Sequence, residues 1–208
     1  MSIQRQAATK AFGVEEGHPT YRLRQARYYE LATDIARLAK EKESRGEGPL
    51  SVLDVGTYDG VTRKYVEAQA GDLPIEWHGV DIFPYGHEYV HKHTDWQLYH
   101  CDLEEGLNGL PSNRFDVVVC EQVLEHLHGA EHASRELTRV LSPGGTLFAG
   151  VPIFPHGVHL VRKHLVPVSD RLLKVKKVRG HVQAFSLATF RRLVKDSGTM
   201  KIQRARGF

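Results

Sequence analysis

Apolar residues follow two alternating patterns along this chain, one typical of helices and one typical of buried strands. Within residues 21–43 they recur every three or four positions, which predicts a helix that packs beside a sheet. Short apolar runs predict strands at residues 50–55, 75–80, 96–101, 115–120 and 146–151, with helices over 61–70 and 130–141. Strands that alternate with helices at this spacing predict an α/β fold with a mostly parallel central sheet, covered by helices on both faces.

The C-terminal part of the chain extends this pattern only a little further. Ser186 is suited to be the N-cap of a helix over residues 187–197, which Gly198 would end. Residues 200–206 are predicted to form one last strand. An exposed edge of the resulting sheet would favour pairing with a second subunit, so a homodimer is a candidate assembly.

Length and composition favour one soluble domain over residues 1–208. Its hydrophobic fraction of 41% is ordinary for a globular protein. No apolar run approaches the roughly 20 residues that span a bilayer, and the N-terminus is polar, so we expect a cytoplasmic protein. The two cysteines, Cys101 and Cys120, end apolar stretches and predict buried thiols rather than a disulfide framework.

The distribution of charge is more informative than the total. A net charge of +3 is too small to indicate a nucleic-acid partner. Residues 153–181, however, contain seven lysines and arginines against the single acid Asp170, interleaved with apolar residues. This basic amphipathic insert is either a solvated face on a helix that covers the substrate, or a surface for an anionic substrate or for the inner face of a membrane.

Acidic residues stand at the ends of four consecutive predicted strands: Asp54, Asp81, Asp102 and Glu121. Ligands of open parallel sheets bind beyond the carboxyl ends of the strands, so these acids should gather on one side of the sheet. Carboxylates accept hydrogen bonds from hydroxyl, amine and ammonium groups. The sequence therefore predicts a ligand that is rich in donors and carries positive charge.

The motifs around these acids resemble those of the class I S-adenosylmethionine-dependent methyltransferases, over about residues 50–151. The turn after the first strand reads D-x-G-x-x-x-G from Asp54 to Gly60, and the later segments read GVDI, CDL, FDVVVCEQVLEHL and LSPGGTL. The last two are similar to the ubiquinone-methyltransferase-like, small-molecule branch. The resemblance implies a Rossmann-like three-layer sandwich, whose usual seventh strand this chain would lack, and S-adenosylmethionine as cofactor.

The resemblance also implies the cofactor-binding residues. Asp81 would accept the two ribose hydroxyls, and Asp102 would meet the adenine amino group with Leu103 beside the ring. The full set is Asp54, Gly56, Tyr58, Asp59, Gly60, Asp81, Ile82, Asp102, Leu103 and Glu121. Tyr58 departs from the branch, which commonly has glycine there; it would close over the methionine end of the cofactor, point into the substrate pocket, or simply pack in the turn.

Methyl transfer needs an aligned nucleophile and, for a hydroxyl acceptor, a group that takes its proton. His126 and His181 are the candidate bases, and a carboxylate or activated carbon acceptor would need none. We expect O-methylation of a small or lipid- or glycan-linked, anionic acceptor. Methylation of protein or RNA, or a non-catalytic binding module, are the alternatives.

The thirteen histidines do not by themselves predict a metal site. His87, His91 and His93 are closely spaced, but the sequence identifies no further ligand or supporting shell. We expect surface or packing roles for them and no bound metal.

Overall fold

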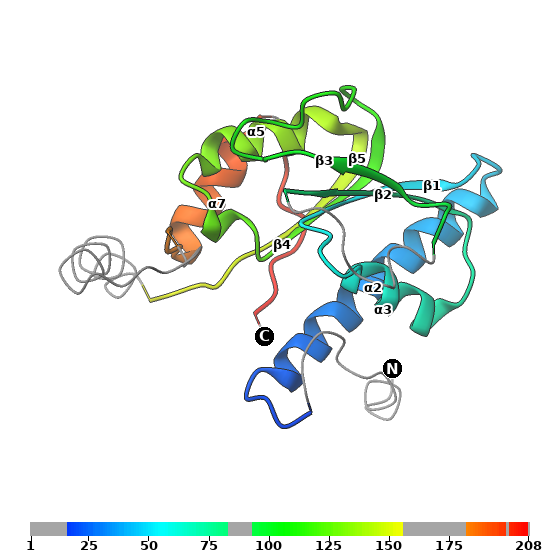
Figure 1. Cartoon of the computed structure of the whole chain (residues 1–208), viewed down its shortest axis with the longest axis horizontal. Helices are drawn as coiled ribbons and strands as arrows, with labels where there is room; N and C mark the ends of the chain where they lie inside the picture. Colours follow the sequence, from blue (N-terminus) through cyan, green and yellow to red (C-terminus); the bar gives the residue numbers. More distant parts are fainter. Residues whose placement is uncertain (1–15, 83–92, 156–181, 199, 208) are drawn as a thin grey trace.

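A five-stranded parallel sheet forms the centre of the computed structural model, which describes residues 16–82, 93–155, 182–198 and 200–207. The strand order is β3-β2-β1-β4-β5 (Figure 1). The strands are β1 (Leu50–Val55), β2 (Ile75–Asp81), β3 (Gln97–His100), β4 (Phe115–Glu121) and β5 (Leu141–Gly150). The helices are α2 (Tyr21–Ser44), α3 (Val61–Ala70), the short 3₁₀ helix η1 (Leu124–His126), α5 (Ala130–Val140) and α7 (Leu187–Asp196).

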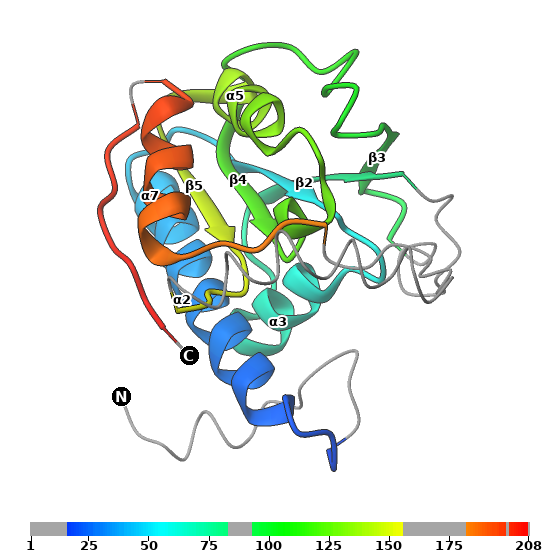
Figure 2. The same ribbon diagram turned by 90° about the vertical axis from the view of Figure 1, so that its left-hand side faces the viewer.

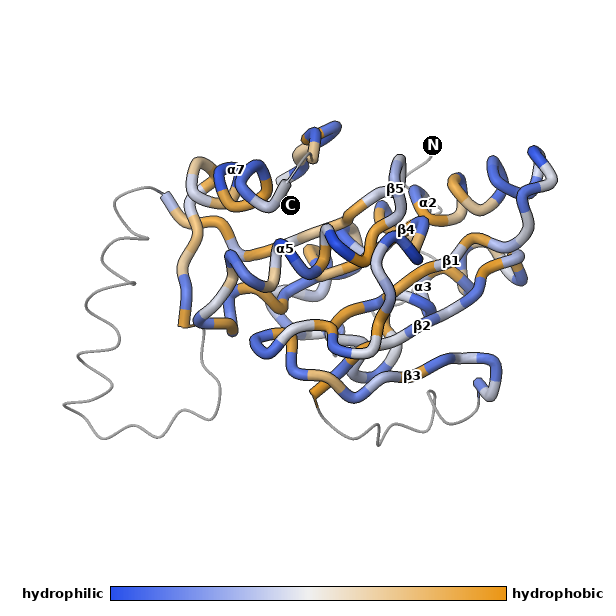
Figure 3. The backbone as a smooth tube through the Cα atoms, turned by 90° about the horizontal axis from the view of Figure 1, so that it is seen from above, coloured by the Kyte–Doolittle hydropathy of each residue, from blue (hydrophilic) through white to orange (hydrophobic). Residues whose placement is uncertain are grey.

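The sheet separates two hydrophobic clusters because side chains alternate across it. Val52 of β1 packs with Ile35 of α2 and Tyr65 of α3, whereas Leu53 joins the cluster that contains Leu137 of α5. Figure 2 shows α2 and α3 on one face of the sheet and α5 and α7 on the other. All six residues of β1 are buried, as expected for a central strand covered on both faces. Figure 3 shows the apolar runs of β1 and β4 in the middle of the molecule.

The predicted fold class is therefore confirmed: a parallel sheet between helical layers, without a seventh strand in the described ranges. Each strand predicted up to residue 151 is present. β5 begins earlier than predicted, at Leu141, because the segment with Pro143 pairs across a register shift between Phe115 and Val117. Ser186 caps α7 as predicted, accepting a hydrogen bond from the Thr189 amide at 3.2 Å.

The prediction of a last strand over residues 200–206 is wrong. No strand is assigned in the described residues 200–207. Ion pairs attach this segment to α2 instead, with Arg206 contacting Glu30 and Asp34, and Arg204 contacting Asp34 at 3.6 Å.

The basic insert lies outside the described residues, apart from positions 153–155. The described residues on either side of it approach each other: Ile153 forms a parallel bridge with Phe185, and the Phe154 amide donates to the Phe185 carbonyl at 2.8 Å. Among the helices that the structure describes, none is long and apolar enough to cross a membrane.

Candidate functional site

The turn between β1 and α3 is bound tightly to the neighbouring strand. The amides of Gly56 and Thr57 both donate to the Val80 carbonyl, at 2.8 and 3.1 Å. Gly56 has φ +77°, and a Cβ there would lie 2.5 Å from Val123 Cγ2, so the turn needs glycine at this position. Gly60, with φ +74°, is the N-cap of α3. The predicted glycines thus shape the turn that leads into the helix.

Asp54 lies buried beneath this turn. Its side chain accepts a hydrogen bond from Thr62 Oγ1 at 3.1 Å. Burial raises the pKa of Asp54 to about 7, and the nearby carboxylates of Glu121, Asp81 and Asp59 add to the rise, against the hydrogen bond from Thr62. A cation beside Asp54 would favour its ionised form.

Asp81, the last residue of β2, contacts the same turn from the other side. Its Oδ2 accepts a hydrogen bond from the Tyr58 amide at 2.9 Å. The acid predicted to meet the ribose is therefore connected directly to the residue that departs from the family's glycine.

Glu121 ends β4 and faces α2. Its Oε2 lies 3.4 Å from Arg27 Nε, an ion pair longer than a good hydrogen bond. The carboxylate occupies space above Gly150 that any Cβ at that position would take. Burial raises the pKa of Glu121 to about 7, although the Arg27 guanidinium opposes the rise.

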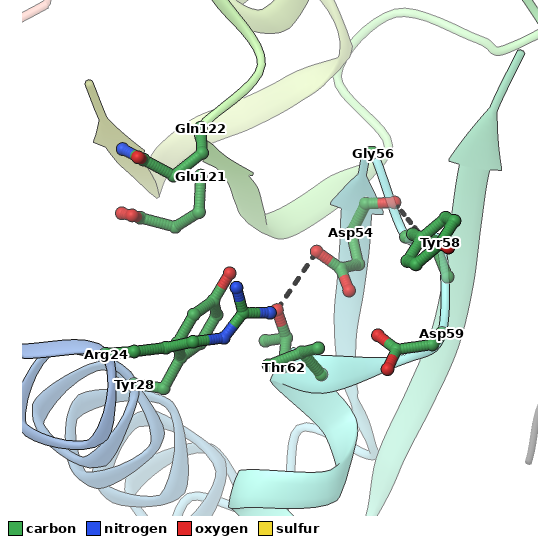
Figure 4. A pocket seen from close by; sticks show the side chains of 11 residues that line it. Arg24, Tyr28, Asp54, Gly56, Tyr58, Asp59, Thr62, Glu121 and Gln122 are labelled. Carbon is green, nitrogen blue, oxygen red and sulfur yellow. Dashed lines mark hydrogen bonds between the residues drawn. The ribbon is translucent and has the colours of Figure 1, made fainter. Parts of the chain in front are cut away.

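The turn after β1, α2, the start of α3 and the end of β4 surround a pocket, shown in Figure 4, whose lining does not include the predicted Gly60 and Asp81. Its lining combines predicted residues with others from α2, α3 and the end of β4. The lining residues are Arg24, Tyr28, Asp54, Gly56, Thr57, Tyr58, Asp59, Val61, Thr62, Glu121 and Gln122. In Figure 4 Arg24 and Tyr28 extend from α2, while Glu121 and Gln122 come from the end of β4. The buried Asp54, the partly buried Asp59 and Glu121, and one arginine therefore face a shared space at the carboxyl ends of β1 and β4.

Six of the lining residues were not predicted: Arg24, Tyr28, Thr57, Val61, Thr62 and Gln122. The signal available for the first two was their spacing of four residues in a predicted helix, which puts them on one face. The Arg24 and Arg27 guanidiniums lie 5.4 and 5.1 Å from the centre of the Tyr28 ring. Burial raises the pKa of Tyr28 to about 12, so its phenol stays protonated near neutral pH.

The other predicted residues lie outside that lining. Asp102 Oδ1 accepts from the Glu104 amide at 2.9 Å, Leu103 is buried in the core, and the Ile82 carbonyl contacts His100 Nε2 at 2.7 Å. His126 lies on η1, and His181 falls outside the described residues. The roles predicted for these five residues, like those predicted for the residues of the lining and for Gly60 and Asp81, stay predictions.

The prediction that the protein binds no metal is also untested. Within the described ranges, no group of three or more histidine, cysteine, aspartate or glutamate side chains could hold an ion. Two of the three closely spaced histidines, His87 and His91, lie outside those ranges.

A second buried glutamate, Glu125 on η1, was not predicted. It is 1% exposed, and neither carboxyl oxygen has a hydrogen-bond partner among the described residues. Burial raises its pKa to about 7, with repulsion from Glu121 adding to the effect. Its carbonyl accepts from the amides of Val182 and Gln183, at 2.9 and 3.0 Å. The chain that follows the insert is therefore bound to the turn after β4.

Replacing Glu125 by glutamine should stabilise the protein at pH 8 and change little at pH 4. The raised pKa means that the folded protein keeps a proton that an unfolded glutamate releases near pH 4, so stability falls as the pH rises from about 4 to about 7. Glutamine removes this loss, which is on the order of 1–3 kcal/mol. Urea denaturation at the two pH values measures it. Glu43→Gln on the exposed face of α2 is the control, and an equal gain at both pH values would contradict the buried charge.

A comparison with protein families shows which family this chain belongs to. A family model described as a methyltransferase domain matches residues 23–203. The chain belongs to this methyltransferase family. The match confirms the predicted enzyme class, a methyltransferase with S-adenosylmethionine as methyl donor, and the ubiquinone-methyltransferase-like branch stays a prediction.

Solved structures, two of them of methyltransferases, share the fold at low sequence identity. The YcgJ protein of Bacillus subtilis is 18% identical with a TM-score of 0.56, over 81% of this chain and 68% of that one. An arsenic(III) S-adenosylmethionine methyltransferase from Chlamydomonas reinhardtii is 24% identical with a TM-score of 0.55, over 72% and 51%. Phosphoethanolamine N-methyltransferase 2 from Haemonchus contortus, in complex with phosphomonomethylethanolamine and S-adenosylhomocysteine, is 20% identical with a TM-score of 0.51, over 73% and 33%. This chain therefore spans about half the length of the arsenic methyltransferase and about a third of the length of the phosphoethanolamine N-methyltransferase.

Proposed function

We propose that the pocket at the ends of β1 and β4 binds the methionine end of S-adenosylmethionine and presents its methyl group to an acceptor. The observation that carries this proposal is a pair of carboxyls, the buried Asp54 and the Glu121 side chain at 11% exposure, facing the same pocket as the guanidinium-bearing Arg24. A ligand with an ammonium, a sulfonium and a carboxylate complements those charges. S-adenosylmethionine has all three.

The charges of the pocket divide naturally between the parts of this ligand. Arg24 would bind the carboxylate, since a guanidinium pairs with it through two parallel hydrogen bonds. Asp54 and Glu121, both with pKa values raised to about 7 by burial, would face the positive groups, which favour the ionised carboxylates. The amide-rich turn at Gly56 lets the ligand approach the backbone closely.

The bound cofactor supplies an activated methyl group, so the protein's own contribution is to position the acceptor and remove a proton where one is released. For the acceptor we retain a small or lipid- or glycan-linked molecule with an anionic group, methylated on oxygen. The sequence of the basic insert supports the anionic group. His126 and His181 remain the proposed bases.

Replacing Asp81 by alanine should weaken S-adenosylmethionine binding by about 10- to 100-fold, because two hydrogen bonds from ribose hydroxyls to a charged group are lost. The measurement is calorimetric titration of the purified protein. Asp81→Asn should lose less, since an amide oxygen still accepts one hydroxyl. Asp72→Ala, which removes an exposed aspartate from the loop before β2, is the matched control.

The outcomes separate the alternatives. A wild-type chain that binds no S-adenosylmethionine would contradict the proposed function and favour a non-catalytic module. Binding that survives Asp81→Ala would refute the ribose contact alone. Mass spectrometry of small anionic acceptors, peptides and RNA incubated with the binding-competent enzyme then separates the acceptor classes.

A further inference from the structure

Tyr58 combines three features that the proposed function has not used. Its backbone is in the left-handed region, with φ +44°. Its side chain is 59% exposed, unlike the buried aromatic rings of the core. It also lines the pocket. Among the described residues two other non-glycine positions have positive φ: Asn113, of a type that tolerates this conformation, and Gln122, which lines the same pocket.

The backbone conformation of Tyr58 carries a cost that glycine would avoid. Gly56 and Gly60, two residues to either side, have φ +77° and +74°, so alternate positions of this turn are in the left-handed region, which glycine adopts freely and in which a side chain is strained. The hydrogen bond from the Tyr58 amide to Asp81, at 2.9 Å, holds this geometry. The residue is 59% exposed, so much of its surface is in solvent at the edge of the pocket that it lines. Strain of this kind is characteristic of ligand-binding sites.

The rest of the pocket indicates which ligand chemistry the ring meets. Asp54 and Glu121 line the same pocket as Tyr58, and their carboxyls favour a cation there. An aromatic face attracts such a cation and has much weaker attraction for the neutral thioether that remains after methyl transfer. The ring and the two acids would therefore act on the same positive centre.

We propose that Tyr58 is the residue by which this pocket distinguishes the sulfonium of S-adenosylmethionine from the neutral sulfur of S-adenosylhomocysteine. This inference rests on the proposed function. The ring lies over the sulfonium and shields it from water, and the contact weakens when the charge is lost. Tyr58 is thus a specificity residue that favours the methyl donor and helps the product to leave.

Calorimetric titration of both ligands into Tyr58→Leu and Tyr58→Phe tests the proposal. Leucine keeps the side-chain bulk and the backbone strain but lacks the aromatic face, so S-adenosylmethionine binding should weaken by about 5- to 30-fold. S-adenosylhomocysteine binding should change by less than about threefold, since its sulfur carries no charge. Phenylalanine keeps the aromatic face and should keep the wild-type ratio of the two affinities.

A second measurement keeps the proposal independent of folding defects. Tyr58→Gly relieves the left-handed strain, so its melting temperature without ligand should equal or exceed that of the wild type. A clear fall would mean that the ring packs structurally, which would overturn the proposal. Equal weakening of both ligands in Tyr58→Leu would also overturn it, because the ring would then be a neutral cover. A wild type that binds neither ligand would instead refute the proposed function.

Discussion

Raising the pH from 6 to 8 should tighten S-adenosylmethionine binding by about tenfold for each pocket carboxyl that ionises, and by up to about 100-fold for both. Burial raises the pKa of Asp54 and of Glu121 to about 7, so the protein without ligand holds protons on both at pH 6. A cationic ligand favours the ionised carboxylates and lowers both pKa values. Binding therefore releases protons, and affinity rises with pH until both groups are ionised in the free protein.

Calorimetry at pH 6, 7 and 8, in buffers of different ionisation enthalpy, measures both the affinity and the number of protons released. Glu121→Gln should remove about half of the pH dependence, because one titrating carboxyl remains. Glu43→Gln, on the exposed face of α2, should leave the dependence unchanged. An affinity that is flat from pH 6 to pH 8 would show that these carboxyls do not face the positive groups of the cofactor.

The central sheet could be predicted from sequence because its strands are buried on both faces. β1 and β4 are short runs of apolar residues in which Asp54, Asp116 and Glu121 are the acids, a pattern that few other elements produce. Parallel strands bring their carboxyl ends to one side of a sheet, so the proximity of Asp54 and Asp81 to one turn also follows from strand order. The strands and the acids at their ends could be predicted because neither depends on how the helices pack.

The remaining site residues depend on contacts between elements, which periodicity does not encode. Arg24 faces the pocket because α2 crosses the sheet at one particular angle, and the helical pattern shows only which face is apolar. The left-handed backbone of Tyr58 and Gln122 is set by the turns around them rather than by their own preferences. The strand predicted over residues 200–206 does not form, and Arg206 of this segment pairs instead with Glu30 on α2, a contact between residues far apart in sequence.

Replacing Arg63 by alanine should lower the free energy of unfolding by about 2–4 kcal/mol, the largest effect on stability that we expect. Arg63 is 6% exposed. Its guanidinium lies 5.7 Å from the Trp77 ring centre and 5.2 Å from that of Trp96, and it donates to Glu67 at 2.7 Å and to Asp95 at 3.0 Å. Alanine removes both aromatic contacts and leaves a cavity between the two indoles.

Urea denaturation measures this loss, provided that the slope of the free energy of unfolding against urea concentration is the same for both proteins. Arg37→Ala is the matched control, because Arg37 is an exposed arginine of α2 with an i,i+4 partner, Glu41, and such a pair contributes less than about 1 kcal/mol. Arg63→Lys should recover only part of the stability, since an ammonium cannot stack on the rings or bind two carboxylates as a planar fork does. A loss no larger than that of Arg37→Ala would mean that the guanidinium does not hold α3 against the sheet. Because the first turn of α3 supplies Val61 and Thr62 to the pocket, that hold also matters for cofactor binding.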